Sequence, residues 1–169
     1  MCPRRVRSFR ALAAALLAVS PIAFAQSEGK ACALTSPDEL QAAIGLKPNL
    51  KGSALPNGVE VCTGKAGLST VTIRLHPKKD DAEMEKEEAK LDALQKAGAS
   101  METKRVGKIN CREIRPGGKA MRQPYTTSCT TATTARMPRY AVIEVSSPTQ
   151  SLEMRKLAAL AESIAERVF

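Results

Sequence analysis

The cysteines of this chain constrain its fold more than any other feature, because the first 25 residues change how many of them remain. Those residues have the parts of a secretory signal peptide: an arginine-rich start, an apolar stretch over 11–24, and the small-x-small site Ala23-Phe24-Ala25. Cleavage after Ala25 removes Cys2 and leaves four cysteines: Cys32, Cys62, Cys111 and Cys129. An even number in an exported chain predicts two disulfide bonds formed in an oxidising compartment.

Four cysteines can pair in three ways, and the residues alone leave all three open. No C-x-x-C motif occurs in the sequence. Widely spaced cysteines do not form the exposed thiolate of low pKa that redox catalysis needs. We therefore expect the cysteines to stabilise the fold, whichever way they pair.

The signal peptide also defines the mature domain. Residues 26–169 would remain, and these 144 residues fit a single domain with its own core. The segment Glu28-Gly29-Lys30-Ala31 before Cys32 lacks the aliphatic residue of a bacterial lipobox. No later segment approaches the ~20 apolar residues of a transmembrane helix. We expect a periplasmic or secreted protein with neither a lipid anchor nor a transmembrane helix.

Three segments carry helical signals. Ser36-Pro37-Asp38-Glu39 combines an N-cap, a proline in the first turn and a capping box, and Gly45 ends that helix. Residues 80–97 predict a charged helix whose apolar stripe is thin, so it should lie on the surface. The third helix is expected to open with the N-cap Ser147 and to bury an apolar stripe in the core.

Strands are predicted wherever apolar and polar residues alternate, most clearly at Val71, Ile73 and Leu75. Prolines and glycines predict a loop over 46–58. The order of helices and strands predicts an α+β fold: one mainly antiparallel sheet with three helices in a single domain. The predicted strands are 59–63, 69–76, 101–106, 109–115, 126–134 and 139–146.

Charge is distributed unevenly along the mature chain, which has 22 basic and 17 acidic residues. Residues 80–96 contain seven acids and three bases, whereas residues 104–139 contain nine bases and one acid, Glu113. A basic surface attracts anions, although exposed charge also serves solubility alone. Tyr125 is the only aromatic residue of the basic segment, so we expect no nucleic acid partner. The candidates for ligand binding are Arg112, Arg115, Lys119, Arg122, Arg136 and Arg139.

Few residues are suited to catalysis. His76 is the only histidine, so a typical zinc or copper site lacks a second one. No G-x-S-x-G, H-E-x-x-H or phosphate-binding glycine loop occurs. The acids of residues 80–88 would lie around a helix instead of converging on a cation. We expect no metal, no cofactor and no enzymatic activity. The alternative is an envelope hydrolase or redox enzyme with a site around His76.

One stretch has a familiar order of residues. Cys32-Ala33-Leu34-Thr35-Ser36-Pro37-Asp38-Glu39-Leu40 is followed by Ala43-Ile44-Gly45 and then by Val61-Cys62-Thr63. This resembles the opening of a family of small exported bacterial domains of unknown function, known best from actinobacterial secreted lipoproteins. The resemblance covers most of residues 32–168. It implies no reaction, but it implies a compact α+β fold related to PsbP-like domains and a disulfide from Cys32 to Cys62. Cys111 and Cys129 would then pair, so that each bond closes one half of the chain.

Together these features favour a non-enzymatic domain that binds through a basic β surface. The expected partner is an anionic envelope component, such as lipopolysaccharide phosphate or a wall polymer, or another envelope protein. A further alternative is an accessory domain that only packs against another protein. No pattern in the sequence specifies an oligomeric state.

Overall fold

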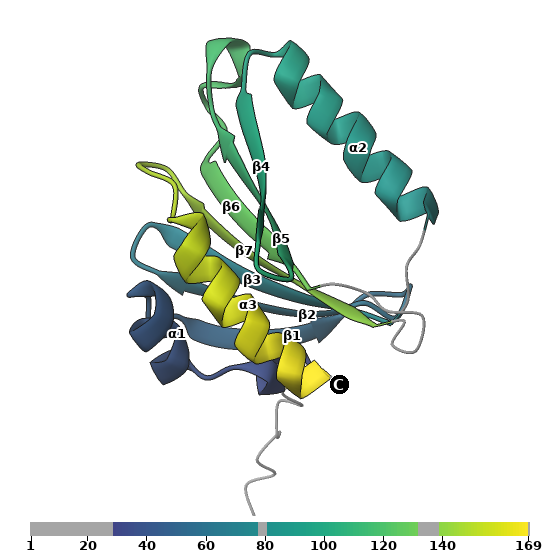
Figure 1. The fold of residues 1–169 in the computed structure, drawn as a ribbon, viewed down its shortest axis with the longest axis vertical. Coiled ribbons are helices and arrows are strands. Elements are labelled where there is room, and N and C mark those ends of the chain that lie inside the picture. The colour runs from purple at the N-terminus through teal and green to yellow at the C-terminus, as the bar shows by residue number, and fades with distance from the viewer. Residues whose placement is uncertain (1–28, 78–80, 132–138, 169) are drawn as a thin grey trace, which may run out of the picture.

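The computed structural model describes residues 29–77, 81–131 and 139–168, and within them it contains a seven-stranded sheet that is antiparallel throughout. Three helices, α1 (Pro37–Ile44), α2 (Asp81–Lys96) and α3 (Met154–Val168), complete an α+β fold, which confirms the predicted fold class (Figure 1). The strands are β1 (Asn49–Ala54), β2 (Glu60–Ala66), β3 (Ser69–His76), β4 (Ser100–Val106), β5 (Ile109–Arg115), β6 (Tyr125–Thr130) and β7 (Tyr140–Ser147).

The sheet consists of two meanders that join side by side. β1, β2 and β3 precede α2, and β4 to β7 follow it, in the spatial order β1-β2-β3-β7-β6-β5-β4. The meanders meet where β3 pairs with β7, from Thr70 opposite Ser146 to His76 opposite Tyr140. β1 and β4 are therefore the two edges of the sheet.

One face of the sheet carries the core, and we call it the covered face. Val71, Ile73 and Ile143 alternate along β3 and β7 with residues of the other face, and they are fully buried. α3 packs against this face with Leu157 and Ile164, and α1 lies beside α3 (Figure 1). The apolar stripe predicted for the last helix is thus confirmed as core.

The opposite face, which we call the open face, is polar and is spanned by α2. Thr72, Thr126 and Ser128 are among its half-buried residues. α2 contacts the open face through Glu83 and Glu87, yet it has no buried residue. The prediction of a surface helix is confirmed.

Both disulfides are present. Cys32 in the short 3-10 helix η1 (Cys32–Leu34) is bonded to Cys62 in β2, and Cys111 in β5 is bonded to Cys129 in β6. Cys111 and Cys129 are directly opposite in the β5–β6 ladder. The first bond therefore attaches a separate segment to the sheet, whereas the second links strands that are already paired.

The first helix forms as its sequence predicts. The hydroxyl of Ser36 accepts a hydrogen bond from the amide of Glu39 at 3.2 Å, and the Glu39 carboxylate accepts one from the amide of Ser36 at 2.9 Å. Gly45 ends the helix in the left-handed region, with φ 74°. The N-cap and the left-handed glycine thus mark the two ends of α1.

The predicted loop over residues 46–58 is wrong in its middle, because Asn49–Ala54 form the edge strand β1. Five of its six residues are exposed, so the alternation that reveals a strand is missing. β1 is held by pairing with β2 and by close packing of Gly52 against Gly29. Neither contact has a local sequence signal.

The predicted start of the last helix is also wrong. Ser147 is the last residue of β7, and its hydroxyl lies 3.2 Å from that of Thr149 in a local turn. The carbonyl of Leu152 accepts a hydrogen bond from the hydroxyl of Thr127 at 2.9 Å, and α3 begins only at Met154.

Two predicted segments lie outside the described residues. They are the signal peptide, which contains Cys2, and residues 132–134 at the end of the predicted strand 126–134. None of the described helices is long and apolar enough to span a membrane.

Candidate functional site

The basic residues predicted for ligand binding do not form one surface on the sheet. Arg112 lies on the open face, where its Nη1 is 3.4 Å from Oε1 of Glu87 in α2. Arg139 precedes β7, at the end of the sheet where β6 finishes. Arg136 lies outside the described residues. The three remaining candidates are at the opposite end of these strands.

These three candidates come together where the chain passes from β5 to β6. Arg115 ends β5, Lys119 lies in the short 3-10 helix η2 (Gly118–Ala120), and Arg122 follows it. Lys96, the last residue of α2, precedes the turn that packs against η2. All four side chains are exposed. We call Lys96, Arg115, Lys119 and Arg122 the basic corner.

Glycines hold the end of α2 against η2. The amide of Ala120 donates a hydrogen bond to the carbonyl of Ala97 at 3.2 Å. A Cβ on Gly117 would lie 2.5 Å from the carbonyl oxygen of Gly98, and one on Gly118 would lie 2.8 Å from that of Ala97. A larger residue at either position would push the two backbones apart. The basic corner is therefore a fixed arrangement of two segments that are far apart in sequence.

The charges of the basic corner differ in how far they are neutralised. Arg115 donates from Nε to Oε1 of Glu113 at 2.6 Å and from Nη2 to Oε2 at 3.2 Å. Its guanidinium holds the pKa of the buried Glu113 carboxyl below its usual range. Lys96, Lys119 and Arg122 form no ion pair with any other residue that the structure describes. Within the described ranges, these three positive charges of the corner are therefore not neutralised by an ion pair.

An exposed apolar residue lies within the same segment. Met121 stands between Lys119 and Arg122 in sequence, and 77% of its surface is exposed. Three of the corner's cations were predicted from the sequence, whereas Met121 and Lys96 were not. Lys96 belongs to the acid-rich helix, and only the contact between α2 and η2 brings it to the basic segment.

His76 lies on the open face, at the end of β3. Its ring is 6% exposed and stacks on Tyr140, with the ring centroids 4.4 Å apart. Its Nδ1 is 3.7 Å from Oε2 of Glu83 and has no hydrogen-bond partner among the described residues. Burial lowers the pKa of His76 although the Glu83 carboxylate opposes this effect. The imidazole is consequently a neutral, enclosed side chain at neutral pH.

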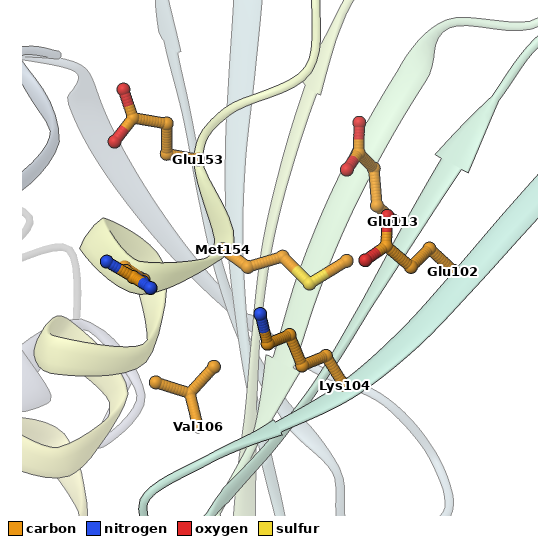
Figure 2. A pocket seen from close by; sticks show the side chains of 7 residues that line it. Glu102, Lys104, Val106, Glu113, Glu153 and Met154 are labelled. Atoms are coloured by element: carbon orange, nitrogen blue, oxygen red, sulfur yellow. The ribbon is translucent and has the colours of Figure 1, made fainter.

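Two shallow hollows lie beside α3. One of about 340 Å³ lies between β4, β5 and the start of α3, and Glu102, Glu113 and Lys104 are on its wall (Figure 2). The other, of about 580 Å³, lies between α1 and α3 over Ala42 and Leu160. Neither contains His76. In the part of the chain that the structure describes, no three His, Cys, Asp or Glu side chains are placed to hold a metal ion.

Comparisons with protein-family models, with curated proteins and with solved structures found no match to this chain. The resemblance to small exported bacterial domains therefore stays a prediction. An α+β fold and the Cys32–Cys62 bond, two features that the resemblance implies, are present.

Proposed function

We propose that this protein is a non-enzymatic extracytoplasmic domain that binds a phosphate-bearing component of the cell envelope through the basic corner. The observation that carries the proposal is the gathering of Lys96, Lys119 and Arg122, without counter-ions among the described residues, at one fixed corner. The proposed site is compact and lies at the end of β5, whereas the sequence predicted a basic surface spread over the sheet.

Physical chemistry favours an anion at this corner. Three cations that no described residue neutralises raise the local concentration of anions, and the attraction weakens as salt is added. The ammonium groups and the guanidinium donate hydrogen bonds that suit phosphate oxygens. Met121 adds an exposed apolar contact beside them.

The chemistry of the other candidate residues supports binding over catalysis. All four cysteines of the predicted mature chain are joined in disulfides, so they supply no nucleophilic thiol. His76 is stacked, buried and neutral, and it lies in neither hollow beside α3. The disulfides also suit an oxidising compartment, which agrees with the predicted signal peptide.

The test is binding of the oxidised protein to neutral phospholipid vesicles with and without lipopolysaccharide, measured by co-sedimentation over a range of salt concentrations. We expect binding only when lipopolysaccharide is present. The variant Lys96→Glu/Lys119→Glu/Arg122→Glu should bind at least about tenfold more weakly and should lose most of the salt dependence.

The matched control is Lys51→Glu/Lys65→Glu/Lys108→Glu, which makes the same change in net charge at exposed positions away from the corner. It should retain most of the binding. Equal weakening by both triple variants would mean that net charge alone governs binding, and the proposed site would be wrong. Absence of binding by the unmodified protein would also contradict the proposal.

A further inference from the structure

β4 leaves one edge of the sheet without a partner strand. Among the described strands it pairs with β5 alone, so its outer N–H and C=O groups have no partner in the sheet. Five of its seven residues are exposed. A long exposed edge of this kind is a template for another strand.

The sequence of β4 is complementary to itself in charge. Two copies related by a two-fold axis perpendicular to the sheet run antiparallel, and opposed residues then lie on the same face. In the register that overlaps all seven residues, Thr103 faces Thr103 of the second copy. Glu102 then faces Lys104 of the second copy, and the symmetry repeats this pair.

The neighbouring registers do not share this complementarity. Because side chains alternate, symmetric pairing allows only shifts that keep opposed residues on one face. One such shift places Glu102 opposite Glu102 of the second copy, and the other places Lys104 opposite Lys104 of the second copy. Like charges directly opposite are destabilising, whereas opposite charges stabilise a strand pair. The longest overlap is thus also the register that charge favours.

The surroundings of Glu102 point the same way. Within one copy Glu102 faces Glu113 of β5, and Figure 2 shows the two side chains as neighbours, with the Glu113 carboxylate directed away from Glu102 and Lys104 further along the strand. Arg115 pairs with Glu113 and also attracts Glu102, so Glu102 lies beside an ion pair on its inner side. A second copy would place the ammonium group of Lys104 on its outer side.

The other edge lacks this property. β1 carries a single charge, Lys51, and has six residues. A strand with an even number of residues cannot overlap completely with its own copy under the same symmetry, because its end residues lie on opposite faces. Its nearest symmetric registers place Lys51 against Lys51 or against Ser53 of the second copy, so neither forms an ion pair.

From these observations we propose that two copies of this protein associate through β4, forming a continuous antiparallel sheet across a two-fold axis at Thr103. The proposal goes beyond the anion-binding function and does not depend on it. An edge-to-edge interface is small, so the dimer should be reversible and should depend on protein concentration.

Sedimentation velocity of the oxidised protein over a wide concentration range tests the proposal. We expect a monomer–dimer equilibrium, and Lys104→Glu or Glu102→Lys alone should weaken it at least about tenfold. The double variant Glu102→Lys/Lys104→Glu exchanges the charges and should restore dimerisation. Lys108→Glu, in the β4–β5 turn, changes the same charge away from the pair and should have little effect.

A Thr103→Cys variant tests the register independently. Directly opposed residues have Cβ atoms about 5 Å apart, close enough for a disulfide after a small adjustment. Air oxidation should yield a covalent dimer of Thr103→Cys but not of Lys108→Cys. A protein that stays monomeric at every concentration would overturn the proposal, as would a dimer unaffected by either single charge reversal.

Discussion

The covered and open faces of the sheet carry helices of almost equal length that contribute very differently. α3 has 15 residues and buries six of them, whereas α2 has 16 residues and buries none. α3 presents a broad apolar stripe to the core, while α2 has only Met84, Leu91 and Leu94, all half-buried. The apolar face of a helix, and not its length, determines what it adds to stability.

The difference also separates the contacts that stabilise the molecule from the proposed binding site. The disulfides, the core and the pairing of the meanders all belong to the covered face or to the strands themselves. α2 is held to the rest by the contact of Glu83 with His76, by the ion pair of Glu87 with Arg112 and by the glycine contact at its end. Its last residue, Lys96, can therefore serve the basic corner without a role in the core.

Truncating one leucine on each helix should give the largest difference between the faces. Leu157 in α3 is fully buried, so Leu157→Ala removes packing and leaves a cavity that costs about 3 kcal/mol of unfolding free energy. Leu91 in α2 is half-buried, and Leu91→Ala should cost less than about 1 kcal/mol. Urea unfolding of the oxidised protein measures both.

Similar losses of unfolding free energy in the two leucine variants would contradict the contrast between the faces. A loss near 3 kcal/mol for Leu91→Ala would mean that α2 is part of the cooperative core. Ile164→Ala, also fully buried in α3, serves as a second test of the covered face and should resemble Leu157→Ala.

The contrast between the helices was predictable, because it rests on local patterns. The capping box of Ser36 and Glu39 and the stripe of α3 are read within a few residues, and the structure has both. β1 was missed because an exposed edge strand has no alternation, and its pairing with β2 is a tertiary contact. Ser147 was misread because a hydroxyl that caps a helix can equally close a turn after a strand.

The candidate site was predictable only in part, for the same reason. Charge runs identify Arg115, Lys119 and Arg122 but not which face each residue occupies. Side chains alternate along β5, so Arg112 lies on the open face and pairs with Glu87. Lys96 belongs to α2 and reaches the corner through the contact of α2 with η2. Gly98 contacts Gly117 and Gly118, and this contact brings Lys96 to the other cations of the corner. It depends on the path of the whole chain between β4 and β6.

The polar contact between α3 and the N-terminal segment should contribute less to the free energy of unfolding than the apolar core of the covered face. Arg167 in α3 donates to the carbonyl of Leu34 at 2.8 Å and forms a paired contact with the Glu39 carboxylate. Both partners are about two-fifths exposed, so water screens the ion pair. Arg167→Gln should therefore cost about 1 kcal/mol at pH 7, whereas Lys156→Gln, at another exposed ion pair of α3, should cost less than about 0.5 kcal/mol.

Unfolding at acidic pH provides a second measurement of the contact between Arg167 and Glu39. The Arg167 guanidinium, with smaller contributions from the Ser36 amide and the Thr35 hydroxyl, lowers the pKa of Glu39 to about 2 in the folded protein. Stability from a depressed carboxyl pKa is present above the unfolded value, near 4.5, and is lost as the pH falls toward 2. The free-energy difference between Arg167→Gln and the unmodified protein should shrink over this range. A constant difference would mean that Arg167 acts through Leu34 alone.

The smallest effect is expected at the contact between α2 and the open face. Burial lowers the folded pKa of His76, and Arg74 acts in the same direction, against the carboxylates of Glu83 and Glu87. The unfolded chain therefore binds a proton more readily, so this contribution is full above the ordinary pKa of 6.5 and decreases as the pH falls through it. Between pH 7.5 and pH 6 the loss should be less than about 0.8 kcal/mol.

His76→Phe separates this titration from the packing of the ring. Phenylalanine keeps the stacking on Tyr140 but does not titrate, so urea unfolding of the variant should change less between pH 7.5 and pH 6 than that of the unmodified protein. If the unmodified protein instead became more stable at pH 6, the attraction of Glu83 for the imidazolium would outweigh burial. α2 would then be held to the open face by a charged pair, and the contrast with the apolar attachment of α3 would be sharper than the neutral ring implies.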